Sequence, residues 1–121
     1  MLETLKKSPS HLKALITGFP KSGKTFTAFE IAKGVREYFE LVDVPIAVFD
    51  SENAAPYLAA RLRREGIEVV AQQSRTLADL IETVEACVER GLQVLVVDNV
   101  SHVWKETVKS YLQEVNRQRQ A

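Results

Sequence analysis

Residues 18–26 of this 121-residue chain read GFPKSGKTF, and one residue, Thr17, separates them from the apolar run ALI at 14–16. These nine residues combine two glycines and a proline with two lysines, so the segment joins small side chains to positive charge. Glycine and proline favour a tight loop over a regular element. After the loop, apolar residues recur at helical spacing from 24 to about 40: Ala28, Ile31, Ala32, Val35 and Phe39. The stretch therefore predicts a strand, a tight loop and an amphipathic helix in succession.

The rest of the chain repeats this alternation of short apolar runs and helical runs. The predicted strands span 12–17, 45–50, 68–72 and 93–98, and the predicted helices span 24–40, 54–65, 76–91 and 105–121. The runs PIAVFD and QVLVVD are almost continuously apolar, which is typical of parallel strands covered on both faces. Strands that alternate with helices of this length predict βαβ units. We therefore expect an α/β domain with three layers, α/β/α, and a mostly parallel sheet.

The composition fits a single domain over 1–121, with residues 1–10 as a flexible leader. Sixteen basic and sixteen acidic residues cancel, so no overall field draws the chain to nucleic acid or to a membrane. Cys87 is the only cysteine, which excludes an internal disulfide and multi-cysteine zinc sites, and we expect it to be a buried apolar residue. No run is long and apolar enough for a signal peptide or a membrane span. We expect a cytoplasmic protein without a membrane partner.

Gly18, Gly23, Lys24 and Thr25 match the pattern G-x-x-x-x-G-K-[ST], in the strand-to-helix context that this pattern requires. The glycines let successive main-chain N–H groups surround a phosphate at the positive end of the helix. Lys24 adds a charge against the β- and γ-phosphate oxygens, and the Thr25 hydroxyl can ligate Mg²⁺. The predicted nucleotide-binding residues are Gly18, Phe19, Pro20, Lys21, Ser22, Gly23, Lys24, Thr25 and Phe26. Of these, Lys21 fits a solvated loop residue better than a second phosphate ligand.

Three carboxylates end the two buried strands. Asp98 ends QVLVVD, where side chains at the carboxyl edge of a parallel sheet point into the ligand crevice, so it is the candidate acid on the magnesium side. Asp50 and Glu52 end the other strand and share one side of an extended backbone, while Ser51 faces the other side. Either carboxylate could reach a γ-phosphate through a water. The alternative is that Glu52 opens the second helix, where the helix dipole favours a carboxylate.

These pieces together resemble the ATPase core of the RecA-like P-loop family, in particular compact phage-encoded ATPases of that type. The matching segments are GFPKSGKT, AVFDSEN, VVAQQ, the helix after Thr76 and VLVVDNVSHVW, so the resemblance covers roughly residues 12–104. The resemblance implies that the chain binds ATP with Mg²⁺ and hydrolyses it, with Glu52 and Lys24 as the catalytic residues. It places Thr25 and Asp98 on the magnesium ion, and it implies work on DNA such as recombination or strand annealing.

Two features depart from the family pattern. Asn99 takes the place of the Ser or Thr that often follows the strand-end aspartate. Family members also have an extra strand between the phosphate-loop strand and the aspartate strand, followed by DNA-binding loops, whereas nothing after Asp98 reads as a strand. We therefore expect a core that is incomplete at its C-terminus, cut within the helix that ends in QEVNRQRQA. Its first strand would then face an unfilled slot, a partner chain or a rearranged pairing.

The sequence leaves more than one function open and predicts two kinds of partner. Strand exchange between copies predicts a homo-oligomer, and single-stranded DNA would be bound through regions outside this chain. The leading function is Mg²⁺-dependent ATP hydrolysis coupled to DNA transactions, with weak turnover by the isolated chain. The alternatives are a nucleotide-binding switch or assembly module with the helix after Trp104 as its partner surface, and a small-molecule kinase, for which an arginine-rich lid is missing.

The remaining candidate residues carry weaker signals. No guanine-specific N/T-K-x-D signature occurs, which favours adenine. The arginines at 61–64 and at 117–119 fit solvated helix faces better than an arginine finger. His102 has no second ligand at a suitable spacing, so it fits a surface or loop histidine better than a metal ligand.

Overall fold

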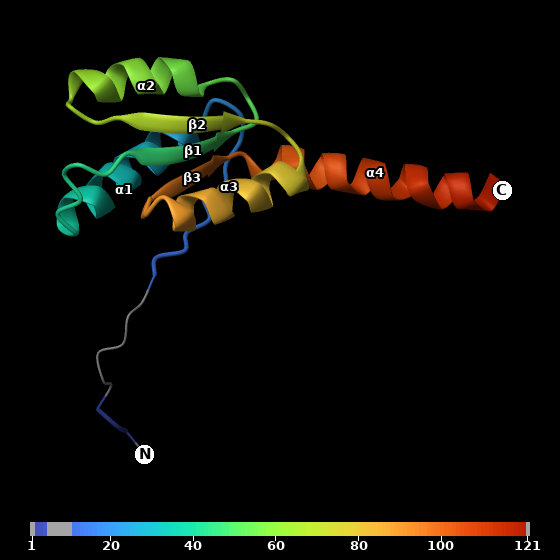
Figure 1. Ribbon diagram of the computed structural model, residues 1–121, viewed down its shortest axis with the longest axis horizontal. Helices are drawn as coiled ribbons and strands as arrows, with labels where there is room; N and C mark the ends of the chain where they lie inside the picture. The colour runs from blue at the N-terminus through green and yellow to red at the C-terminus, as the bar shows by residue number, and fades with distance from the viewer. Residues whose placement is uncertain (1, 5–10, 121) are drawn as a thin grey trace.

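The computed structural model describes residues 2–4 and 11–120 and shows an α/β domain (Figure 1). Its elements are, in order, α1 (Lys24–Tyr38), β1 (Ile46–Asp50), α2 (Ala55–Arg64), β2 (Val69–Gln73), α3 (Leu77–Glu89), β3 (Leu95–Asp98) and α4 (Val100–Gln120). Strands and helices alternate along this part of the chain, as the apolar periodicity predicts. The predicted leader over 1–10 falls largely on residues 1 and 5–10, which lie outside the described residues.

The three strands form a parallel sheet in the order β2-β1-β3. All five residues of the central strand β1 are buried, which explains why its first four residues, 46–49, are all apolar. In the register between β1 and β3, Asp50 lies opposite Asp98. Both strands therefore end at the same edge of the sheet, and the residues that follow them meet there.

Helices cover both faces of the sheet, as the three-layer expectation requires. On one face Phe29 of α1 and Leu62 of α2 pack with Ile46, Val48 and Val96 of the strands, and all five are buried. α3 covers the opposite face of β1 (Figure 1). Cys87 on α3 is buried, as predicted, and burial raises the pKa of its thiol. The core thus packs α1 against β1 and β3, which come later in the chain.

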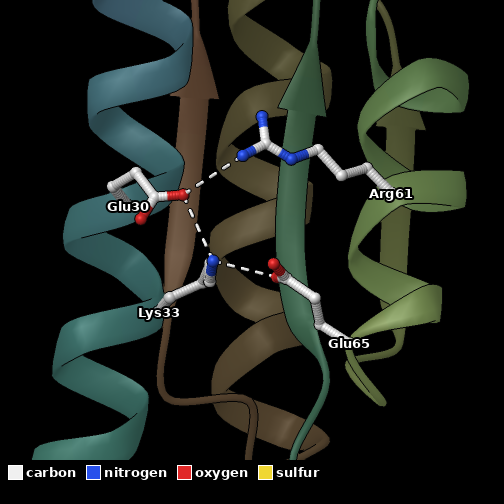
Figure 2. A network of polar contacts seen from close by, with 4 residues as sticks. All are labelled: Glu30, Lys33, Arg61 and Glu65. Atoms are coloured by element: carbon white, nitrogen blue, oxygen red, sulfur yellow. Dashed lines mark hydrogen bonds and ion pairs between the residues drawn. The ribbon is translucent and has the colours of Figure 1, made fainter.

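A network of ion pairs joins α1 to α2 at the surface of this core (Figure 2). Lys33 Nζ lies 2.9 Å from Glu65 Oε2 and 3.2 Å from Glu30 Oε1, and an Arg61 Nη atom lies 3.8 Å from the same Glu30 oxygen. The Arg61 guanidinium also stands 4.7 Å from the centre of the Phe26 ring. Exposed ion pairs contribute little stability each, but this network occupies Arg61, which is therefore not a free cation.

The predicted strand over 12–17 is wrong: these residues form no strand, and the described sheet has three strands only. Leu12 and Leu15 are 65% and 79% exposed, although their sequence is apolar. A strand exists only where a neighbour accepts and donates its main-chain hydrogen bonds, and within 11–120 the outer edge of β3 has no paired strand. Within the described residues the segment at 12–17 therefore pairs with no strand, and the rearranged pairing does not occur there.

The predicted element boundaries need smaller corrections. α4 begins at Val100 instead of 105, because Asn99 accepts a hydrogen bond from the His102 amide and so caps the helix. β3 begins at Leu95 instead of 93, and β2 covers 69–73 instead of 68–72. α4 extends away from the sheet as a single helix (Figure 1). Among the described helices, none has the length and apolarity needed to cross a bilayer.

Candidate functional site

Both glycines of the loop over 18–23 fit its local geometry, Gly23 through its backbone conformation and Gly18 through its close approach to Ser22. Gly23 has φ +90°, a left-handed conformation that L side chains rarely adopt. A Cβ built on Gly18 would stand 2.6 Å from Ser22 Oγ, so any larger residue there would displace the Ser22 side chain. The Ser22 amide closes the turn by donating to the Phe19 carbonyl at 3.1 Å. The conformation of the loop therefore explains why glycine occurs at both of these positions.

The loop delivers the chain to an uncapped helix N-terminus. α1 begins at Lys24, its N-cap Gly23 offers no side-chain hydrogen bond, and its first turn holds no acidic residue. The first amides of a helix have no partner within the helix and carry a partial positive charge. Lys24 Nζ donates to the Gly18 carbonyl at 3.1 Å, so this ammonium bridges the two ends of the loop. Main-chain donors and an ammonium thus gather at one point.

Thr25 links this helix start to the end of β3. Its Oγ1 donates to Asp98 Oδ2 at 3.1 Å, although 73 residues separate the two in sequence. Asp98 is only 8% exposed, and burial raises the pKa of its carboxyl above the ordinary value. The hydrogen bond from Thr25 opposes this rise in pKa, the charges of Glu52 and Asp50 add to it, and that of Lys24 opposes it. Residues from three segments therefore meet at one edge of the sheet.

Asp98→Asn is expected to stabilise the unliganded protein. Because the folded-state pKa of Asp98 is raised, the folded chain binds more protons than the unfolded chain between pH 3.8 and that raised pKa. Stability contributed by this group is therefore lost as pH rises through that window. Asparagine removes the buried charge and still accepts from Thr25, so the melting temperature at about pH 7 should rise by about 2–4 °C. A fall of the same size in thermal melts would contradict this account of Asp98.

Asp50 has a structural role that the sequence reasoning missed. Its side chain is 1% exposed, and its oxygens accept from the amides of Glu52 at 3.0 Å, Ala54 at 3.3 Å and Ala55 at 2.9 Å. It therefore caps α2, and its oxygens are occupied. The expectation that Asp50 and Glu52 share one direction is wrong, because β1 ends at Asp50 and strand alternation stops there. α2 begins at Ala55, so Glu52 does not open it either.

Asp50→Ala is expected to lower the free energy of unfolding by about 2–3 kcal/mol, because three amides lose their acceptor. Urea unfolding of the variant and the wild type measures this difference. Asp43→Ala removes an exposed aspartate from the loop before β1 and serves as the control, with an expected change within about 0.5 kcal/mol. A change at Asp50 as small as that of the control would show that its hydrogen bonds do not stabilise α2.

Glu52 is exposed, and its side chain is held by Asn99. Glu52 Oε1 accepts from Asn99 Nδ2 at 2.6 Å across the gap between the ends of β1 and β3. Beneath this contact, the Ser51 hydroxyl accepts from the Asn99 amide at 2.8 Å and lies 2.9 Å from His102 Nδ1. The sequence reasoning missed these partners, although an asparagine before a helical run is a recognisable N-cap signal.

The other predicted residues lie around this centre. Phe19, Pro20 and Lys21 are exposed on the loop, and Lys21 has a left-handed φ of +64°. Phe26 lies under Arg61, on the side of α1 that faces α2. Arg117 pairs with Glu114 on α4 at 2.7 Å, which fits the predicted solvated face. The structure therefore groups Lys24, Thr25, Asp98 and Glu52, and leaves the exposed loop tip apart from them.

The donor set at this edge suits Mg²⁺. Thr25 and Asp98 present a hydroxyl and a carboxylate oxygen 3.1 Å apart, and Mg²⁺ takes one or two such protein ligands together with water and phosphate oxygens. Within residues 2–4 and 11–120 no group of three His, Cys, Asp or Glu side chains could hold a metal alone. Comparisons of the chain with protein-family models, curated proteins and solved structures found no match.

Proposed function

We propose that the chain is the ATP-binding core of a RecA-like P-loop ATPase that hydrolyses ATP with Mg²⁺. One observation carries the proposal: the glycine loop leads into an uncapped helix N-terminus whose second residue, Thr25, is hydrogen-bonded to the strand-end Asp98. This arrangement joins a donor-rich anion site to a pair of hard oxygen ligands. The sequence resemblance supplies the nucleotide and the reaction.

Each group at the site has a defined part in this proposal. The loop and first-turn amides bind the phosphates, and Lys24 leaves the Gly18 carbonyl to contact the β- and γ-oxygens. Thr25 and Asp98 hold Mg²⁺, which when bound offsets the negative charge of the triphosphate. The raised pKa of Asp98 fits this role, because a buried carboxylate next to other acids favours a cation beside it.

Glu52 serves as the general base. Its side chain is exposed at the same edge, and Oε1 is the oxygen that Asn99 holds. The other carboxylate oxygen can take a proton from a water as that water attacks the γ-phosphorus and the bond to the β–γ bridging oxygen breaks. ADP and phosphate are the products. Asp50 cannot share this role, since its oxygens cap α2.

Phosphate release by the purified chain tests the proposal. We expect slow, saturable release from ATP with Mg²⁺, and none after EDTA removes the metal. Arg75, which lies next to the site, donates its Nε to the Ser51 carbonyl at 3.0 Å and is therefore held by the main chain, so a slow rate agrees with the structure. Thermal stabilisation by ATP and GTP, each with Mg²⁺, compares the two bases, and ATP should stabilise more. Failure of both nucleotides to stabilise the protein would refute the proposal.

Coupling to DNA, assembly into a homo-oligomer and a cytoplasmic setting belong to the same proposal. The first rests on the resemblance, the second on the expected strand exchange between copies, and the third on the composition. The net charge of zero supplies no general attraction to a polyanion. We therefore place DNA contacts outside this chain, where family members carry their DNA-binding loops. A longer form that binds a fluorescent single strand with no salt dependence, or not at all, would remove the DNA part.

A second candidate is a nucleotide-binding assembly module with little hydrolysis. α4 extends from the domain, and its side chains Trp104, Tyr111 and Leu112 are 68%, 67% and 52% exposed. Such large apolar side chains on one extended helix are typical of a surface that packs against another chain. Saturable ATP binding without Mg²⁺-dependent phosphate release would favour this candidate over the ATPase.

A further inference from the structure

Three groups of Asn99 make hydrogen bonds, and only its side-chain Nδ2 group contacts a residue of the candidate site. Its main-chain amide donates to Ser51 Oγ at 2.8 Å, and its Oδ1 accepts from the His102 amide at 3.0 Å. With the oxygen held by α4, the Nδ2 group must point away from the helix. It donates to Glu52 Oε1 at 2.6 Å. The orientation of this side-chain amide is therefore set by its partners and not by chance.

This contact ties Glu52 to the strand end that carries Asp98. Glu52 follows β1 in a bend, and its side chain is exposed, so its own backbone leaves it many rotamers. A short hydrogen bond from an amide N–H to a carboxylate is among the stronger neutral-to-charged contacts. It removes that freedom, uses one carboxylate oxygen and leaves the other open. Asn99 directly follows Asp98, whose carboxylate contacts Thr25.

We propose that Asn99 is a positioning residue that holds the Glu52 carboxylate beside Thr25 and Asp98 with one oxygen free for the attacking water. The inference rests on the proposed ATPase function and adds a residue to it. Asn99 touches neither nucleotide nor water in this role, because it acts through Glu52. The Ser51 hydroxyl and the N-terminal turn of α4 in turn hold Asn99, so the ends of β1, β3 and α4 set the position of one carboxylate.

Two substitutions separate this role from capping of α4. Asn99→Asp has the same shape and still caps the helix, but it replaces the donor with an acceptor facing Glu52. Asn99→Ser also caps the helix, is neutral and is too short to reach Glu52. Both should lower kcat for phosphate release by roughly ten- to a hundredfold, with the Kd for Mg·ATP and the melting temperature close to those of the wild type. An unchanged or raised kcat in both variants would overturn the proposal.

A measurement without nucleotide tests the contact itself. The side-chain amide signals of Asn99, assigned by their loss in Asn99→Ser, should move in Glu52→Ala and stay in Glu68→Ala, which alters an exposed glutamate ahead of β2. If the chemical shifts of the Asn99 side-chain amide are the same in Glu52→Ala as in the wild type, the positioning role is overturned even if the wild type hydrolyses ATP. If the signals respond but the wild type releases no phosphate, the ATPase proposal fails, and the catalytic role of Asn99 fails with it.

Discussion

Lys24→Met is expected to weaken binding of Mg·ATP by about ten- to a hundredfold. The Lys24 ammonium bridges the loop ends by donating to the Gly18 carbonyl, so it already lies where the phosphates are expected. A hydrogen bond to a charged group contributes about 1.5–3 kcal/mol, which corresponds to this range of affinity. Methionine keeps most of the length and the apolar stem of the side chain and removes the ammonium group with its charge and its N–H donors. Isothermal titration with a non-hydrolysable ATP analogue measures the loss.

Lys21→Asn is the matched control, because it removes a second positive charge from the same loop. Asparagine tolerates the left-handed conformation that Lys21 adopts at φ +64°. Lys21 is exposed and makes no hydrogen bond that the structure records, so affinity should change by less than about threefold. If both variants weaken binding equally, general attraction to a basic loop explains the binding, and Lys24 has no special position.

Glu52→Gln is expected to lower kcat for phosphate release by about a hundred- to a thousandfold at equal ATP occupancy. Glutamine keeps the shape of the side chain and can still accept from Asn99, but it cannot take a proton from water. General-base catalysis typically contributes a factor in this range. Single-turnover assays at saturating Mg·ATP measure the rate, and the titration used for Lys24 establishes that occupancy is equal.

Glu68→Gln provides the comparison for this second substitution. Glu68 is exposed and precedes β2, and removing its charge should leave the rate unchanged. A Glu52→Gln rate equal to that of the wild type would remove Glu52 from the base role. It would leave the phosphate loop untouched, since Lys24 and Thr25 belong to a different segment and are tested by binding.

Periodicity alone predicted most of the regular elements. β1 stands out because it is covered on both faces, so its sequence is apolar at successive positions, whereas alternate residues of β3 are only half-buried. α3 has a capping threonine, Thr76, whose side chain accepts from the Asp79 amide, and that pair is visible in the sequence. The sequence already indicates that Thr25 opens a helix and that Asp98 ends a parallel strand, and both are expected at one magnesium site; the structure brings them together although no strand precedes α1 within residues 11–23.

The features that could not be predicted from the sequence depend on strand pairing and hydrogen bonds between residues that are distant along the chain. The apolar run at 12–17 has the composition of a strand, but pairing requires a neighbour that the described sheet does not place beside it. Asp50 and Glu52 are both acids near a strand end, and only the bend after Asp50 sends one to cap α2 and the other toward Asn99. Asn99 is a common helix cap in sequence terms, and its second contact appears only once β1 and β3 are paired.

The claim on which the proposals depend is that amides of the loop and of the first turn of α1 bind a polyphosphate beside Thr25 and Asp98. Amide chemical shifts recorded while the full chain is titrated with a non-hydrolysable ATP analogue and Mg²⁺ test it most directly. We predict saturable shifts that are largest for residues 21–26, with smaller shifts at Glu52 and Asp98, and their loss in Lys24→Met. Shifts that do not saturate, or that centre on α3 or α4 while residues 21–26 stay unchanged, would contradict the claim.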